Sequence, residues 1–213
     1  MSGTAPVTPV EPSPWNLPNA LTVLRIILVP VFGWLLLSHG GDSVVHRWLA
    51  CAVFVGAMIT DKVDGDIARS RGLVTNFGKV ADPIADKALS GMAFIGLSVL
   101  DVIPWWMTVL VLVREWGITL MRFAVIRHGV MPAGRGGKLK TTLQAVALGA
   151  LSAPLWTLPL AGLWEALAWI TLVAAVVVTV VTGVDYVLKA YRLREGSDRT
   201  AAKRARSGGS TGD

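Results

Sequence analysis

Four aspartates stand in two closely spaced pairs in the first half of the sequence, Asp61 with Asp64 and Asp82 with Asp86. Residues three or four apart lie on the same face of an α-helix, so each pair would project its carboxylates from one side of a helix. If the two helices pack side by side, the four acids face one another and repel unless cations lie between them. Divalent cations that prefer oxygen ligands meet that need, and Mg²⁺ suits substrates that bring phosphates. We therefore interpret these aspartates as a candidate metal site.

The small residues near the first pair support this interpretation. Gly65 and Ala68 keep side-chain bulk away from the carboxylate face and leave room for a ligand. Asp66 follows Asp61 by five positions, which turns it roughly to the opposite face, so we leave it outside the site. The alternative is a set of solvated acids at a membrane surface. An Asp at the centre of a membrane-spanning helix costs about 2.5–3.5 kcal/mol on insertion scales, which favours a functional role.

The composition is typical of a membrane protein. Of 213 residues, 53% are hydrophobic and only 16% are charged, whereas soluble domains carry about 25% charged residues. Cys51 is the single cysteine, so a disulfide framework is excluded. One domain is the natural count for this length.

Six apolar segments are expected to be transmembrane helices, and a helix needs about 20 residues to cross the hydrocarbon core. The second, third and fourth are too short unless they include the polar residues beside them. We therefore predict that the second helix continues to about Ser70, the third begins near Gly78 and the fourth runs to about Arg127. The apolar segments are Ala20–Leu37, Trp48–Ile59, Ala88–Leu100, Val102–Val113, Leu143–Leu163 and Ala166–Val184.

The predicted fold class is an all-α integral membrane protein with six transmembrane helices. Of the 20 basic residues, only Arg47 falls on the side opposite the aspartates. Cytoplasmic loops are enriched in Lys and Arg, so we expect both termini and the aspartates at the cytoplasmic face of the cell membrane. Residues 1–18 read as a short flexible leader, 19–194 as the six-helix domain and 195–213 as a disordered basic tail. The tail has no aromatic residues, which disfavours nucleic-acid binding.

The aspartates lie in a pattern that resembles the signature of the CDP-alcohol phosphatidyltransferase family. The matching residues are Asp61-x-x-Asp64-Gly65-x-x-Ala68-Arg69, followed after eight residues by Gly78-x-x-x-Asp82-x-x-x-Asp86. Every fixed position of the signature is present, and six spans are also the architecture of that family. The resemblance implies an enzyme that uses two divalent cations, Mg²⁺ or Mn²⁺, and that forms a homodimer. It implies CDP-diacylglycerol, a lipid of the bilayer, as the donor.

The resemblance also implies roles for individual residues. Asp61, Asp64 and Asp82 would bridge the two cations and Asp86 would complete the second. Asp86 would also be the general base for the acceptor hydroxyl, in a reaction that the cations assist by polarising the pyrophosphate as CMP leaves. The CDP moiety would be contacted by Gly65, Arg69, Thr75, Gly78, Asn19 and Thr22.

Three further segments resemble the branch of the family whose acceptor is glycerol 3-phosphate. They are residues 16–25, the pair Arg114-Glu115, and residues 137–142. In this reading Arg114, Lys138 and Lys140 would bind the acceptor's phosphate. Arg114 interrupts an apolar helix, and its alternative is an internal ion pair with a carboxylate of the site. The two lysines could instead be ordinary positive residues of a cytoplasmic loop.

Other functions remain open. Within the family, the acceptor could be phosphatidylglycerol, as in cardiolipin synthesis, or an inositol phosphate. A water-soluble phosphate needs a basic pocket, whereas a second lipid needs a lateral opening. Outside the family, an ion transporter would place acids deep in several helices. Here the acids cluster in one motif at one face, which disfavours transport.

Overall fold

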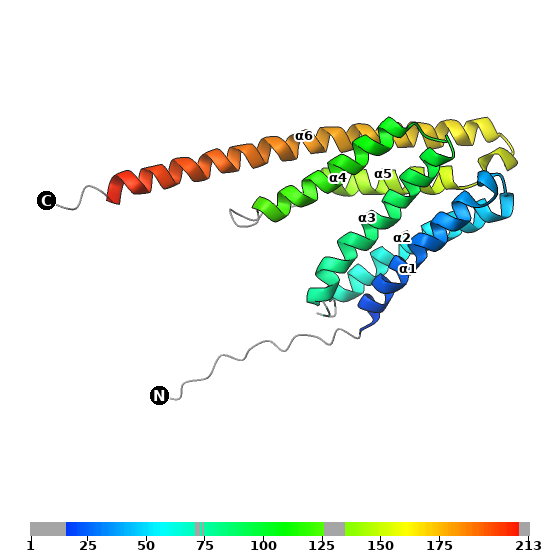
Figure 1. The fold of residues 1–213 in the computed structure, drawn as a ribbon, viewed down its shortest axis with the longest axis horizontal. Helices are drawn as coiled ribbons and strands as arrows, with labels where there is room; N and C mark the ends of the chain where they lie inside the picture. Colours follow the sequence, from blue (N-terminus) through cyan, green and yellow to red (C-terminus); the bar gives the residue numbers. More distant parts are fainter. Residues whose placement is uncertain (1–15, 71–72, 74, 126–134, 209–213) are drawn as a thin grey trace, which may run out of the picture.

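The described part of the chain is entirely helical, which confirms the predicted fold class at that level (Figure 1). The computed structural model describes residues 16–70, 73, 75–125 and 135–208. Two short 3₁₀ helices, η1 (Ser38–Gly41) and η2 (Leu155–Thr157), lie in the turns that precede α2 and α6. The α-helices are α1 (Leu17–Leu37), α2 (Val44–Ser70), α3 (Asn76–Val99), α4 (Trp105–Val125), α5 (Arg135–Ser152) and α6 (Ala161–Gly208).

Side-chain caps fix the starts of the two helices that enter the site from the N-terminal half. At α1, the Asn16 side chain accepts a hydrogen bond from the backbone N–H of Asn19, and Pro18 stands in the first turn. At α3, the Thr75 side chain accepts from the backbone N–H of Gly78 at 3.0 Å. Both caps satisfy N–H groups that have no partner within the helix. Asn16 also donates to the carbonyl of Leu73, so the two capped ends lie together.

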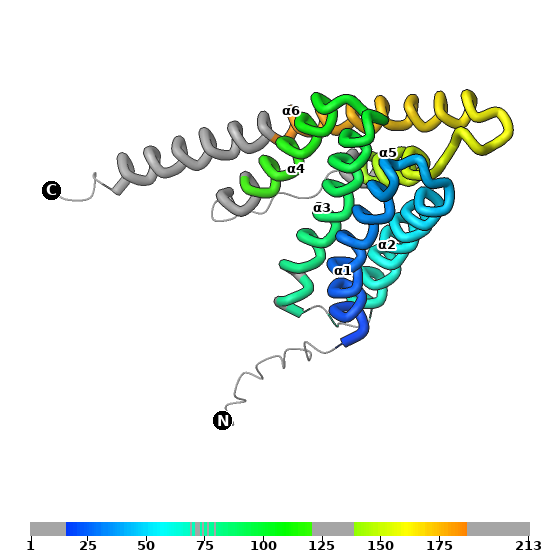
Figure 2. Tube along the Cα trace, turned by 45° about the vertical axis from the view of Figure 1, so that its right-hand side comes forward, coloured from blue at the N-terminus to red at the C-terminus, as the bar shows by residue number. Residues whose placement is uncertain are grey.

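Helix α1 packs against both α2 and α3, and Figure 2 shows the three running side by side. Glycines allow the close approach of α1 and α3. A Cβ at Gly33 would lie 2.8 Å from the sulfur of Met92, and one at Gly96 would lie 2.6 Å from a methyl carbon of Leu36. The buried core around them includes Phe32 and Phe54, whose rings are 5.4 Å apart. The N-terminal half of the chain is therefore tightly packed.

The predicted extensions of the three short apolar runs are confirmed. Helix α2 continues through Asp61 and Asp64 to Ser70, and α3 begins at Asn76 and carries Asp82 and Asp86. Helix α4 runs past Arg114 to Val125, the last described residue before the gap. The aspartate-bearing ends of α2 and α3 are thus continuous with their apolar parts.

One other prediction needs correction. The segment Leu143–Leu163 is not one helix, because α5 begins earlier, at Arg135, and ends at Ser152. Pro154 and Pro159 follow, and a proline lacks the N–H that a helix interior needs, so the apolar run turns before α6. Helix α6 extends to Gly208 and so includes part of the segment 195–213, which was expected to be a disordered tail. The residues there include Glu, Ala, Arg and Lys, which favour helix.

Three of the described helices are long and apolar enough to cross a membrane, by length and composition: Leu17–Gly41, Val44–Ala68 and Ala161–Tyr186. Large apolar side chains cover their outer surfaces. On α6, for example, Ile170 is 65% exposed and Val181 is 62% exposed. Such surfaces are costly in water and suit contact with lipid.

Candidate active site

The first pair of aspartates, on α2, is held by an arginine from α1. Arg25 is only 1% exposed, and its Nη2 donates to Oδ2 of Asp64 at 2.6 Å. Its Nη1 donates to Oδ1 of Asp61. Asp64 is itself buried, whereas about a third of the Asp61 side chain is exposed. The guanidinium therefore supplies the positive charge that two adjacent carboxylates require.

The second pair, on α3, meets α1 one turn closer to the N-terminus of that helix. The Thr22 hydroxyl donates to Oδ1 of Asp82 at 2.5 Å. Nearby, the Thr75 hydroxyl donates to Oδ1 of Asn19 at 3.0 Å. Gly78 closes this group, since a Cβ there would lie 3.0 Å from Asn19 Oδ1 and 3.7 Å from Asp82 Oδ2. Any larger residue at position 78 would press into the polar cluster.

The aspartates fit a cation by chemistry, although they do not form a finished ion-binding shell. Among the described residues, no group of three or more His, Cys, Asp or Glu lies close enough to hold one metal ion. Electrostatic interactions nevertheless connect Asp64 with Asp61 and Asp82, and Asp86 with Asp61. Carboxylate oxygens are the ligands that Mg²⁺ prefers. The buried guanidinium of Arg25 shows that this location accepts positive charge, so the metal site stays a prediction that the donor set supports.

Asp86 lines a pocket enclosed by α2, α3, α4 and α5. Its lining combines polar side chains with the apolar Phe54, Met58 and Leu148. An apolar wall beside a few polar groups is typical of small-molecule sites. The other lining residues are Ser90, Glu115, Lys140, Thr141, Gln144 and Ala145.

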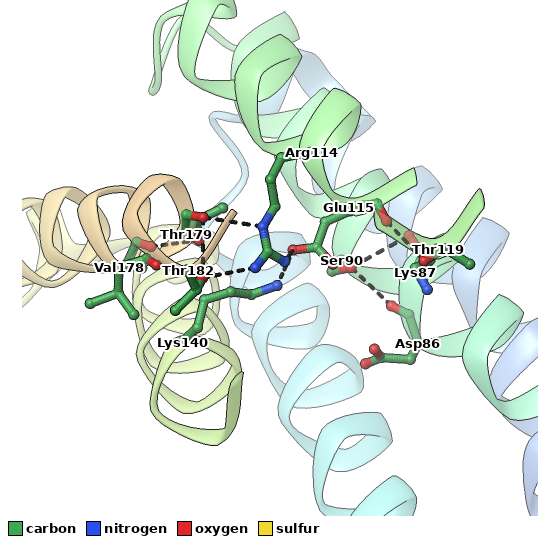
Figure 3. Close-up of polar contacts among 11 residues, drawn as sticks. Asp86, Lys87, Ser90, Arg114, Glu115, Thr119, Lys140, Val178, Thr179 and Thr182 are labelled. Carbon is green, nitrogen blue, oxygen red and sulfur yellow. Dashed lines mark hydrogen bonds and ion pairs between the residues drawn. The ribbon is translucent and has the colours of Figure 1, made fainter. Parts of the chain in front are cut away.

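Glu115 lies between two cationic side chains at this pocket (Figure 3). It accepts a hydrogen bond from Lys140, and its carboxylate is 3.2 Å from Nη1 of Arg114. Lys140 is 6% exposed and belongs to the pocket lining. In Figure 3, the Asp86 carboxylate points toward the side of the site on which Lys140 lies. The pocket thus has a carboxylate on α3 and an ammonium on α5.

Arg114 lies beside the pocket and does not line it. Its Nε donates to the carbonyl of Thr179 at 3.1 Å, and its Nη2 donates to the Thr182 hydroxyl at 2.8 Å. Gly183 makes room for the side chain, because a Cβ there would lie 3.2 Å from Cγ of Arg114. Arg114 forms an internal ion pair, but its partner is the adjacent Glu115, which is not one of the four signature aspartates. The role of Arg114 in phosphate binding stays a prediction.

The structure brings together most of the residues predicted to contact the CDP moiety. Asn19, Thr22, Thr75 and Gly78 form one cluster with Asp82. Gly65 lies on α2 directly after Asp64. Arg69 and Lys138 lie in α2 and α5, but their side chains are outside the described part of the structure.

Sequence reasoning assigned no role to Arg25, Ser90 or Gln144. Arg25 interrupts an apolar helix just as Arg114 does, and that signal could have found it. Gln144 and Ser90 are single polar residues in apolar surroundings, a pattern too common to indicate a site. Their position in the pocket follows only from the packing of α3 against α5.

Comparison with known proteins identifies the family. Residues 15–182 match the sequence profile of the family described as CDP-alcohol phosphatidyltransferase. The chain is 51% identical over 187 residues to a probable phosphatidylglycerophosphate synthase of Mycobacterium tuberculosis (strain ATCC 25618 / H37Rv), covering 88% of this chain and 87% of that protein.

Two further relatives carry the name CDP-diacylglycerol–glycerol-3-phosphate 3-phosphatidyltransferase. One, from Bacillus subtilis (strain 168), is 40% identical and covers 82% of this chain and 95% of its own length. The other, from Rickettsia typhi (strain ATCC VR-144 / Wilmington), is 39% identical and covers 80% of this chain and 94% of its own length. The chain belongs to the CDP-alcohol phosphatidyltransferase family.

Proposed function

We propose that this protein transfers the phosphatidyl group of CDP-diacylglycerol to glycerol 3-phosphate, forming phosphatidylglycerophosphate and CMP. The names of the three relatives, at 39–51% identity over at least 80% of this chain, support the substrates. The observation that carries the proposal is that Asp86 belongs both to the signature aspartates and to the lining of the pocket. The signature aspartates end there, and a pocket that contains the buried Lys140 begins there.

The donor's pyrophosphate belongs at the aspartates. Asp61, Asp64, Asp82 and Asp86 would hold two divalent cations, Mg²⁺ or Mn²⁺, which when bound would polarise the pyrophosphate and neutralise its charge. The cluster of Asn19, Thr22, Thr75 and Gly78 offers hydroxyl and amide groups to the CDP moiety. Gly65 and Arg69, from the same signature, complete the proposed donor contacts. Gly78 keeps this region open, since a side chain would fill it.

Asp86 is the proposed general base. The acceptor's hydroxyl oxygen attacks the phosphorus that bears the diacylglycerol, and the bond from that phosphorus to the oxygen of CMP breaks. The hydroxyl proton passes to the Asp86 carboxylate, and CMP leaves with the electron pair of the broken bond. Asp86 lines the pocket, so its carboxylate can meet an acceptor bound there. Its contact with a cation must then be labile, because a tightly held ligand is not a free base.

The acceptor's phosphate is proposed to bind at Lys140. Lys140 is the cation that lines the pocket, and a buried ammonium is a strong partner for phosphate. Lys138, two residues earlier on α5, and Arg114, which shares Glu115 with Lys140, would assist. The apolar residues of the lining would enclose the rest of a small molecule.

The setting is also part of the proposal. We expect six membrane spans with both termini and the aspartates at the cytoplasmic face, because the basic residues concentrate on that side. The family resemblance supports a homodimer. The donor is itself a bilayer lipid, so a site at the membrane surface lets it enter from the side.

An acceptor screen tests the proposed function. Purified protein would be mixed with CDP-diacylglycerol and Mg²⁺, and CMP release would be followed with glycerol 3-phosphate, phosphatidylglycerol or inositol phosphate as the acceptor. We expect rapid release with glycerol 3-phosphate alone, loss of release in excess EDTA, and recovery on adding Mg²⁺ or Mn²⁺. Preference for phosphatidylglycerol or inositol phosphate would refute the proposed acceptor, and full activity in EDTA would refute the metal assignment.

A further inference from the structure

Gln144 has a buried side-chain amide that lines the pocket and has no hydrogen-bond partner among the described residues. It is 7% exposed and lines the pocket one helical turn beyond Lys140 on α5. Among the residues that the structure describes, none forms a hydrogen bond with its side chain, yet its polar atoms are not sealed from the cavity. An amide offers two donors and one acceptor, and burying it unpaired costs free energy. Its hydrogen bonds are therefore available to whatever fills the pocket.

Two neighbouring polar side chains, Ser90 and Glu115, are already engaged. Ser90 donates to the carbonyl of Asp86 within its own helix at 2.9 Å. Glu115 accepts from Lys140 and Arg114. Among the described lining residues, Gln144 is thus a neutral side chain whose hydrogen-bonding groups are not used within the protein. Lys140 and Gln144 are four residues apart, so they share a face of α5 at a separation of about 6 Å.

We infer that Gln144 is a specificity-determining residue that recognises a non-reacting hydroxyl of the acceptor. The inference rests on the proposed function and specifies its substrate class as a polyol phosphate. With the phosphate at Lys140 and the reacting hydroxyl at Asp86, the remaining hydroxyl of a three-carbon polyol phosphate lies within reach of Gln144. A site built to bond a hydroxyl rejects the analogue that lacks it, because the buried amide is then left unpaired.

The test compares two acceptors that differ by one hydroxyl: glycerol 3-phosphate and propane-1,3-diol phosphate, which lacks the middle hydroxyl. CMP release by the full-length protein in detergent micelles would give kcat/KM for each. Gln144→Leu removes the amide at similar volume. Thr171→Val is the matched control, because the Thr171 hydroxyl bonds to Leu167 in its own helix on α6. Thermal unfolding and CDP-diacylglycerol binding would verify that each variant is folded.

We expect the unaltered protein to prefer glycerol 3-phosphate by at least roughly 10-fold. Gln144→Leu should lower kcat/KM for glycerol 3-phosphate roughly 10- to 100-fold and leave the value for propane-1,3-diol phosphate within about 3-fold. Equal losses for both acceptors, or no loss for either, would overturn the inference.

If Gln144→Leu does not fold, the unaltered protein can still overturn the inference, because equal use of the two acceptors would mean that no residue recognises the middle hydroxyl. A different result is diagnostic of the proposed function itself. If the unaltered protein releases CMP with a lipid alcohol and with neither polyol phosphate, then the proposed acceptor is wrong.

Discussion

Arg25 shows how a single residue can hold the site in shape without a cation from solution. Its guanidinium is 1% exposed and bonds to both Asp61 and Asp64, and its Nε is a buried nitrogen without a partner in the described structure. Burying a charge is costly unless it is paired, and two adjacent carboxylates are costly for the same reason. The guanidinium and the two carboxylates therefore each offset the free-energy cost of burying the other. A bound divalent cation would supply charge at the same place.

Arg25→Met should lower the stability of the metal-free protein and make stability depend on added cations. Breaking a buried ion pair by removing one partner costs about 3–5 kcal/mol. Because a cation bound to Asp61 and Asp64 replaces the lost charge, Mn²⁺ should restore part of that loss. Thermal unfolding in detergent, with EDTA or with Mn²⁺, measures both effects.

Arg47→Met is the matched control for this experiment. Arg47 is also buried, but its guanidinium donates to the carbonyls of Leu151 and Ser152 and, within the described part of the chain, to no carboxylate. Its removal should therefore cost the same stability with EDTA as with Mn²⁺. If Arg25→Met behaves like Arg47→Met, Arg25 contributes packing and backbone contacts, and its link to the cation site is refuted.

At the scale of the helices, Arg114 joins α4 to α6 while Glu115 joins α4 to α5. The first contact uses Thr179 and Thr182, and the second uses Lys140. The pocket is thus framed by polar contacts among the three C-terminal helices. Helices α1, α2 and α3 are joined by polar contacts at the aspartates and by glycines and apolar side chains elsewhere. A change in the Arg114 contacts should reach the acceptor pocket through Glu115.

Arg114→Lys should affect stability and acceptor binding together. A lysine cannot serve Thr179, Thr182 and Glu115 at once, so about 1–3 kcal/mol of stability is lost. Glu115 then neutralises Lys140 more fully, which should raise KM for glycerol 3-phosphate several-fold and leave KM for CDP-diacylglycerol unchanged. Steady-state kinetics and thermal unfolding measure the two effects.

Thr182→Val separates the two consequences. It removes one contact with α6 and leaves the pair Arg114–Glu115 in place. Stability should fall while KM for glycerol 3-phosphate stays unchanged. If KM rises for both substrates in Arg114→Lys, Arg114 shapes the whole site and does not act on the acceptor alone.

The sequence predicted the bounds of a helix well where its apolar run was too short to span a bilayer, because the helix then had to include the neighbouring polar residues. The extension of α2 to Ser70 and the start of α3 near Gly78 follow from the need to span a bilayer, and helical spacing then pairs the aspartates. The start of α5 was placed too late because its first half, which includes the pocket residue Lys140, is polar and is not part of an apolar run. The apolar Leu155 and Leu158, in the following turn, extended the run falsely.

Site residues could likewise be predicted where the signal is local and not where it depends on helix packing. Asp61, Asp64, Asp82 and Asp86 are recognisable from spacing because each pair shares one helix. The pairing of Arg25 with two of them is not, since it depends on how α1 packs against α2. A contact between distant segments has no local spacing signal.

For the whole molecule, the distribution of charge predicts how the protein is oriented in the membrane. The turn between α1 and α2, with η1, lies at the opposite end of α2 from the aspartates. Arg47 near that turn is buried and bonded to backbone carbonyls, so it is a packing residue and does not weaken the charge asymmetry. We therefore expect the aspartate end in the cytoplasm and the η1 end outside.

Cysteine labelling tests this orientation. In a Cys51→Ala background, Asp42→Cys marks the η1 end and Ser70→Cys marks the end of α2, and both positions are exposed. A membrane-impermeant maleimide should label Asp42→Cys in intact spheroplasts and Ser70→Cys only in inverted vesicles. The reverse pattern would contradict the orientation. Labelling of both positions from the same side would show that α2 does not cross the membrane.

The most direct test of the central claim is the stoichiometry of CMP and phosphatidylglycerophosphate formed by purified protein from CDP-diacylglycerol, glycerol 3-phosphate and Mg²⁺. We expect one molecule of CMP to form for each molecule of phosphatidylglycerophosphate. Asp86→Asn should lower the rate by at least about 100-fold while donor binding survives, because a general base contributes roughly 10²–10⁴-fold. Asp66→Asn, an exposed aspartate of the same segment, should keep nearly the full rate. CMP release without the phospholipid product, or a near-normal rate for Asp86→Asn, would contradict the account.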